Sequence, residues 1–169
     1  MQQDPVNYWE QFERLERLIK ASELKAGLIF SFHGLILGLF FDRLNSFQDL
    51  FSESYLFIIF TGLWIIFVII SIYYAIKCFI PKMELKYDTN VFFFGDIVHE
   101  FDDVKSFSRE FIKTCGDEEL LYQQLSEQIH AESKIIDYKF RCVKNSLKYM
   151  SVSLILIVPI LILILKHIL

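Results

Sequence analysis

Cysteine, glycine and proline are scarce in this sequence, and their scarcity argues against a cysteine-based metal site and favours packed helices. The three cysteines, Cys78, Cys115 and Cys142, form no CxxC pair and show no metal-ligand spacing, so we expect reduced thiols without a structural role. Six glycines and three prolines in 169 residues are typical of packed helices.

Motifs that would carry catalysis are also missing. The sequence has no Gly-rich phosphate loop, nucleophile elbow or HExxH pattern, so we expect no enzyme, no catalytic residue and no cofactor. His99 and His130 could share a metal ion with Asp102 or Glu127, but we interpret them as solvated surface residues and expect no metal site. The net charge of -4 gives no argument for nucleic-acid binding.

Long apolar runs are what the sequence does contain. They cover residues of about 26–41, 55–76 and 151–165, and the run 55–76 carries no charged side chain. Crossing a hydrocarbon core of about 30 Å takes roughly 20 helical residues, and a helix is the spanning structure that satisfies such a backbone in lipid. We therefore predict an all-α integral membrane protein with a transmembrane hairpin in residues 26–80 and a third transmembrane helix in residues 151–169.

The charges that flank these runs predict the orientation. Lysines and arginines precede the first span, follow the second and precede the third: Lys20, Lys25, Lys77, Lys82, Lys139, Arg141, Lys144 and Lys148. The connection 42–54 contains one cationic residue, Arg43. The positive-inside rule therefore places the N-terminus and residues 81–150 in the cytoplasm.

Two helical extensions are expected on the cytoplasmic side. In residues 1–25, an amphipathic helix begins near Pro5 and continues without a breaker into the first span. In residues 81–150, a short apolar run at 91–94 is broken by Gly95–Asp96, a short helix covers 106–113, and Asp117 caps a long helix that enters the third span. The apolar stripe of that helix is Leu121, Leu125, Ile129, Ile136, Phe140, Val143 and Leu147. We expect these extensions to pack as a helical sensor bundle.

One face of the first span is lined by small residues, Gly27, Ser31, Gly34 and Gly38, with His33 beside it. Such a face lets helices approach closely in lipid, either within the chain or between subunits around a pore. An ionisable group in a span, such as His33, is a functional candidate, although it could simply hydrogen-bond to Ser31 or to another helix.

Cations recur on the last extension. Lys134, Arg141 and Lys148 follow seven-residue steps, with Lys144 beside them and His130 one turn before Lys134. Such a stripe can hold phosphates through charge-assisted bonds. We favour lipid headgroups for Lys144 and Lys148, and a ligand for Lys134 and Arg141.

Three segments are distinctive: residues 21–27 (ASELKAG), 93–97 (FFGDI) and 128–140 (QIHAESKIIDYKF). In their order and spacing these segments together resemble the Pycsar-type transmembrane effector family. Carried over by position, the family-like residues are Lys25, Phe94, Asp96, His130, Ser133, Lys134 and Lys139. Glu23 stands where the family more often has aspartate.

The resemblance implies an antiphage defence effector of the bacterial inner membrane, encoded beside a nucleotidyltransferase or cyclase. We expect a homo-oligomeric pore or channel that a nucleotide or short oligonucleotide regulates, causing membrane disruption and abortive infection. The expected ligand contacts are Lys25, Phe94, Asp96, His130, Lys134, Lys139 and Arg141. The identity of the signal, and whether it opens or closes the pore, do not carry over. The alternative is a non-conducting membrane anchor or scaffold that recruits a soluble partner.

Overall fold

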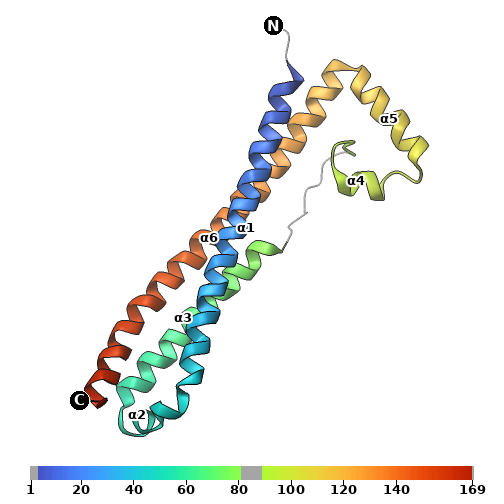
Figure 1. The fold of residues 1–169 in the computed structure, drawn as a ribbon. Helices are drawn as coiled ribbons and strands as arrows, with labels where there is room; N and C mark the ends of the chain where they lie inside the picture. The colour runs from blue at the N-terminus through green and yellow to red at the C-terminus, as the bar shows by residue number, and fades with distance from the viewer. Residues whose placement is uncertain (1–3, 81–88, 169) are drawn as a thin grey trace. The chain divides into compact units, whose positions relative to one another are not determined.

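The computed structural model describes residues 4–80 and 89–168, and every regular element within these ranges is a helix (Figure 1). In chain order the elements are α1 (Pro5–Asp42), the 3-10 helix η1 (Leu44–Phe47), α2 (Gln48–Glu53), α3 (Tyr55–Phe79), α4 (Phe94–His99), α5 (Val104–Gly116) and α6 (Glu118–Ile168). Three of them, α1, α3 and α6, are long and apolar enough to cross a membrane. The predicted all-α, three-span fold class is confirmed.

The two longest helices, α1 and α6, begin at polar caps. The Asp4 carboxylate accepts a hydrogen bond of 3.0 Å from the Val6 N–H, and α1 then continues for 38 residues. The Asp117 carboxylate accepts bonds from the N–H groups of Glu119 and Leu120 at 3.1 and 3.2 Å, and α6 continues for 51 residues. These side chains satisfy N–H groups that have no partner within the helix. The predicted cap at Asp117 and the unbroken first helix are both present.

The chain forms two compact units. The first, here called the extramembrane unit, comprises Met1–Lys20 and Pro81–Asp137, and the second, the membrane unit, comprises Ala21–Ile80 and Tyr138–Leu169. Helices α1 and α6 each contribute to both units without a break in helical structure (Figure 1).

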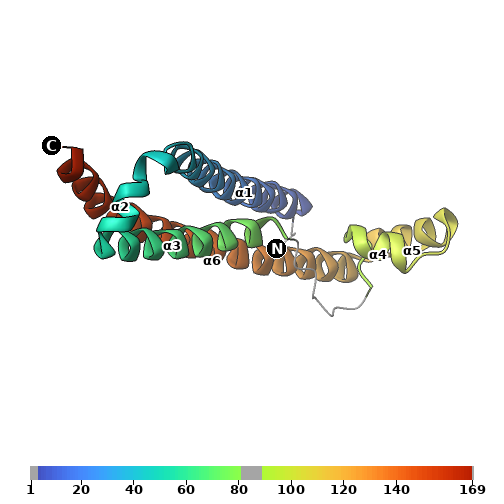
Figure 2. The same cartoon turned by 90° about the horizontal axis from the view of Figure 1, so that it is seen from below.

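In the membrane unit, α3 packs against the adjoining parts of α1 and α6. Apolar side chains from the three helices form one buried cluster: Ala26, Ile29, Ala75, Cys78, Cys142 and Val143. Figure 2 shows α2 in the connection between α1 and α3. A second cluster joins α2, α3 and α6, and it contains Leu50, Phe57, Trp64, Val68 and Ile160. Inside α6, Pro159 lacks the N–H that a helix normally uses and therefore favours a local bend.

In the extramembrane unit, α1 and α6 meet through stacked rings, and α5 is capped. The ring centroids of Tyr8 and Tyr122 lie 5.2 Å apart. A capping box joins Asp103 and Ser106 at the start of α5, which extends the helix predicted at 106–113 to Val104–Gly116.

Two expectations from the sequence were wrong. Gly95–Asp96 is not a breaker, because α4 begins at Phe94 and continues through both residues. Leu147 is 43% exposed despite its place on the apolar stripe, whereas Ser146, next to it in the chain, lies on the buried face. The predicted break at Pro81 lies outside the described residues.

Candidate functional site

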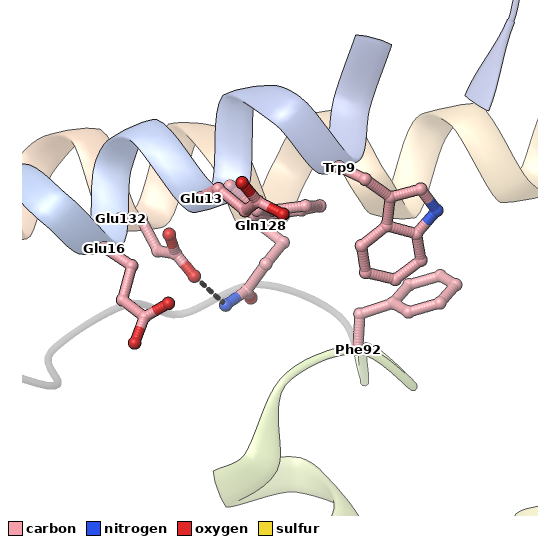
Figure 3. Close-up of a pocket in the computed structure, with 7 residues that line it drawn as sticks. Trp9, Glu13, Glu16, Phe92, Gln128 and Glu132 are labelled. Carbon is pink, nitrogen blue, oxygen red and sulfur yellow. Dashed lines mark hydrogen bonds between the residues drawn. The ribbon is translucent and has the colours of Figure 1, made fainter. Parts of the chain in front are cut away.

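A cavity of about 420 Å³ opens in the extramembrane unit (Figure 3). Helix α1 contributes Trp9, Phe12, Glu13 and Glu16, the turn before α4 contributes Phe92, and α6 contributes Gln128 and Glu132. Binding sites for small molecules typically range from about 300 to 1,000 Å³. The cavity is therefore large enough for a small planar ligand.

Aromatic rings form one side of this cavity. The centroids of Trp9 and Phe12 lie 5.6 Å apart, and Trp9 meets Phe92 edge to face at 6.2 Å. In Figure 3 the indole nitrogen of Trp9 lies on the side away from Gln128 and Glu132. Half of the Trp9 surface is exposed (51%), so a ligand can reach the ring.

The position of Phe92 is fixed by a buried network around Asn90. The Asp96 carboxylate accepts the Asn90 N–H at 2.8 Å, and the Asn90 side chain donates to the Gln124 carbonyl at 2.8 Å. The Gln124 side-chain oxygen in turn accepts the Val91 N–H at 3.1 Å. With its backbone held in this way, Phe92 forms a pre-organised wall.

Gly95 supports the same turn sterically. A Cβ atom at this position would lie 2.7 Å from Cε1 of Phe93, closer than two carbon atoms normally approach. The Phe–Gly–Asp segment singled out in the sequence thus builds the turn that carries Phe92. Within this unit Asp96 is a positioning residue for the cavity.

Carboxylates and one amide form the polar side of the cavity. The Gln128 amide donates to Glu132 at 3.1 Å (Figure 3). Burial, together with the negative charge of Glu16, raises the pKa of Glu132, although the Gln128 bond opposes the shift. Lys20, 2.6 Å from Glu16, lowers the pKa of that carboxyl. The polar side is therefore rich in hydrogen-bond acceptors.

A different arrangement joins the three helices of the membrane unit. The Lys139 side chain is only 5% exposed, and its ammonium donates to the Glu23 carboxylate at 2.7 Å and to the Cys78 carbonyl at 2.6 Å. Cys78 lies in the last turn of α3, where helix carbonyls lack an intrahelical partner. Lys139 of α6 thus caps α3 and pairs with α1.

A second buried polar set lies deeper in the same unit. His33 Nε2 of α1 is 2.9 Å from Ser71 Oγ of α3. The Ser71 hydroxyl donates to the Ser146 carbonyl of α6 at 2.8 Å, and the Ser146 hydroxyl donates back to the Ser71 carbonyl at 2.8 Å. With the Ser71 proton directed at Ser146, Nε2 of His33 is the donor to Ser71 Oγ. His33 therefore hydrogen-bonds to another helix of the same chain. This contact was one of the alternatives that the sequence left open for His33.

The predicted ligand contacts are divided between the two units. Phe94, Asp96, His130 and Lys134 belong to the extramembrane unit, and Lys25, Lys139 and Arg141 to the membrane unit. Phe94, His130, Lys134, Arg141 and Lys25 are exposed, and the Lys25 ammonium lies 5.9 Å from the ring centroid of Phe140. Asp96 and Lys139 are engaged within the chain as described above.

The small residues of the first span fall into two groups by the contacts that they make within the chain. A Cβ on Gly27 would meet Cζ of Phe79 at 3.7 Å, an ordinary contact. Among the residues that the structure describes, a Cβ on Gly34 or Gly38 would have no heavy atom within 4 Å, apart from its own helix backbone and chain neighbours, and Ser31 is exposed. Packing against the described part of the chain therefore does not account for Gly34 and Gly38.

Sequence reasoning did not find the aromatic cavity or the Glu23–Lys139 pair. Trp9, Phe92 and the Gln128–Glu132 pair lie on three segments far apart in sequence, and nothing in the local patterns marks these segments as neighbours. Ser71 was detectable in principle, since it is one of the few polar residues in a span without charged side chains.

The fold and its polar contacts define the class of this protein, a helical membrane protein with three spans. The helices of its first and last spans extend into a second unit, and this unit contains a cavity large enough for a small ligand. The model of one family, the Pycsar effector protein domain, matches residues 7–166, and the chain therefore belongs to that family. The family implies an antiphage defence effector, and Pycsar effectors respond to cyclic nucleotide signals from a cyclase. No curated protein and no solved structure matched the chain.

Proposed function

We propose that this chain is a cyclic-nucleotide-regulated effector that forms an oligomeric pore in the bacterial inner membrane and stops phage propagation by abortive infection. The observation that carries the proposal is the continuity of α1 and α6, which each belong to both units as one unbroken helix. A ligand that prefers one arrangement of these helices in the extramembrane unit biases the spans directly. No catalytic step is needed for this action.

A second copy is part of the proposal, because three spans do not enclose a water path by themselves. The Gly34 and Gly38 positions leave their helix surface open within the chain. Small residues permit close helix approach in lipid, so this face suits contact with a neighbouring subunit. The positively charged flanks of the spans support an orientation with the N-terminus and the extramembrane unit in the cytoplasm.

The proposed phosphate contacts are the exposed cations of α6. Lys134 and Arg141 lie seven residues apart on its exposed face, and His130 lies one turn before Lys134. Each charge-assisted bond to a phosphate would contribute about 1.5–3 kcal/mol. Lys25, Phe94 and Asp96 remain candidates of lower rank, and buried Lys139 suits a structural role.

The second candidate function is a non-conducting anchor that recruits a soluble partner to the membrane. Both functions accommodate the three spans, but they differ in what purified protein does to a sealed vesicle. A pore releases ions when its signal is present, or stops releasing them if the signal is an inhibitor. An anchor leaves the vesicle sealed in either condition.

The test is ion release from vesicles that contain the purified full chain, measured with and without cyclic nucleotides. We expect a nucleotide-dependent change in release, and we expect Lys134→Glu with Arg141→Glu to abolish that dependence. The matched control is Lys105→Glu with Arg109→Glu, an equal charge reversal at exposed positions of α5. Sealed vesicles under every condition would support the anchor, and unchanged control by nucleotide in the α6 variant would move the phosphate contacts elsewhere.

A further inference from the structure

We propose that the cavity of the extramembrane unit binds the base of the nucleotide signal and selects bases with an exocyclic amino group. This inference rests on the proposed control by a cyclic nucleotide and adds the chemistry of recognition. Its basis is one juxtaposition: aromatic rings on one side of a cavity of about 420 Å³, and carboxylates with one amide on the other.

The aromatic side suits a flat heterocycle. Bases outside a helix are commonly stacked on aromatic side chains, a contact that tolerates any base. Trp9 is half exposed, and its ring centroid lies 5.6 Å from that of Phe12 and 6.2 Å from that of Phe92. Phe92 is held by the Asn90–Gln124–Asp96 network, so the wall exists before a ligand arrives.

The polar side decides which base fits. Carboxylates only accept hydrogen bonds when ionised, and one N–H of the Gln128 amide is already directed at Glu132. An exocyclic amino group supplies donors to such a surface. A carbonyl oxygen at the same place would face carboxylate oxygens without a donor, so its desolvation would not be compensated.

The same carboxylates keep the phosphate outside. An anion inside the cavity would meet Glu13, Glu16 and Glu132, whereas Arg17 and Lys20 lie one turn further along α1 and pair with the first two at 3.6 and 2.6 Å. The base therefore enters, and the phosphate stays near the cations of the adjoining helices.

The test uses Trp9 fluorescence in the full-length protein. The chain has two tryptophans, and Trp64→Phe leaves Trp9 as the remaining indole. The Trp64 indole N–H has no hydrogen-bond partner among the described residues 4–80 and 89–168, so this change removes no such bond there. Cyclic CMP and cyclic UMP are the matched probes, because the first has an amino group where the second has a carbonyl.

We expect cyclic CMP to change Trp9 fluorescence and to bind about tenfold more tightly than cyclic UMP, the difference expected for one hydrogen bond to a charged group. Glu132→Gln offers both a donor and an acceptor, so it should reduce the ratio of the two affinities to near one. Glu110→Gln is the control, because Glu110 pairs with Lys113 on α5 and does not line the cavity.

Calorimetry with cyclic CMP, UMP, AMP and GMP separates the two levels of the proposal. If none binds, control by cyclic nucleotides fails and this inference fails with it. If one binds, but Trp9 fluorescence is unchanged or the amino-bearing base is not preferred, the inference is overturned while the proposed function stands. A preference that Glu132→Gln leaves intact would also overturn it.

Discussion

The Glu23–Lys139 pair should show a strongly unequal response to removal of its two members. Lys139 is 5% exposed and cannot reach water, whereas the Glu23 side chain is 38% exposed. Glu23→Leu therefore leaves a buried ammonium without its counter-charge, at a cost of about 3–5 kcal/mol in the free energy of unfolding.

Lys139→Met should cost less. Methionine keeps the apolar stem, and water can hydrate the partly exposed Glu23 carboxylate. The main loss is the donor to the Cys78 carbonyl, which is worth about 1–3 kcal/mol when the acceptor is left unsatisfied. The double variant removes both charges and should cost no more than Lys139→Met alone, because apolar replacement of a buried pair is often neutral.

The measurement is unfolding of the three variants in mixed micelles, followed by far-ultraviolet circular dichroism, with nucleotide affinity measured on the same samples. We expect a coupling energy close to the cost of Glu23→Leu. Additive costs, or a Glu23→Leu variant more stable than Lys139→Met, would contradict the structural role. Lost nucleotide affinity with unchanged stability in Lys139→Met would instead restore Lys139 as a ligand contact.

Three further predictions concern the other polar contacts. Ser71→Ala should lower the free energy of unfolding by about 1–3 kcal/mol because it removes interhelical bonds, whereas Ser151→Ala, at an exposed serine bonded to its own helix, should change it little. Asp96→Ala should cost about 1–3 kcal/mol, since the buried Asn90 N–H loses its acceptor, and hydrogen exchange at Asn90 should accelerate. Burial raises the pKa of Glu132, so stability should fall as pH rises from the usual carboxyl pKa through the raised one, and denaturation at several pH values should show that Glu132→Gln removes this fall.

Local sequence patterns were sufficient for the long helices, but not for the short elements. Asp117 was expected to cap the last long helix, and its carboxylate accepts the N–H bonds that such a cap provides. Gly95–Asp96 was expected to break the chain, and it lies within α4 instead. Propensity failed there because Asp96 stabilises the turn through the Asn90 N–H, a contact that a local pattern does not encode.

The candidate site was less predictable. From the sequence we expected the Phe–Gly–Asp segment and Lys139 to contact the ligand. In the structure Asp96 holds the wall of a cavity and Lys139 holds three helices together. Residue type and spacing do not distinguish a cation that meets a ligand from one that meets its own chain.

The sequence by itself determined the membrane character and the helical class of this protein, because lipid allows an uncharged run such as 55–76 few other structures. It also determined that α1 and α6 continue beyond their spans, since no breaker stands between each extension and its span. The tertiary structure decided the partners of the polar side chains: Glu23 for Lys139, 116 residues away, and Ser71 for His33. The physical reason is that periodicity fixes which face of a helix is buried, whereas the rotation and register of neighbouring helices fix which atoms meet on that face.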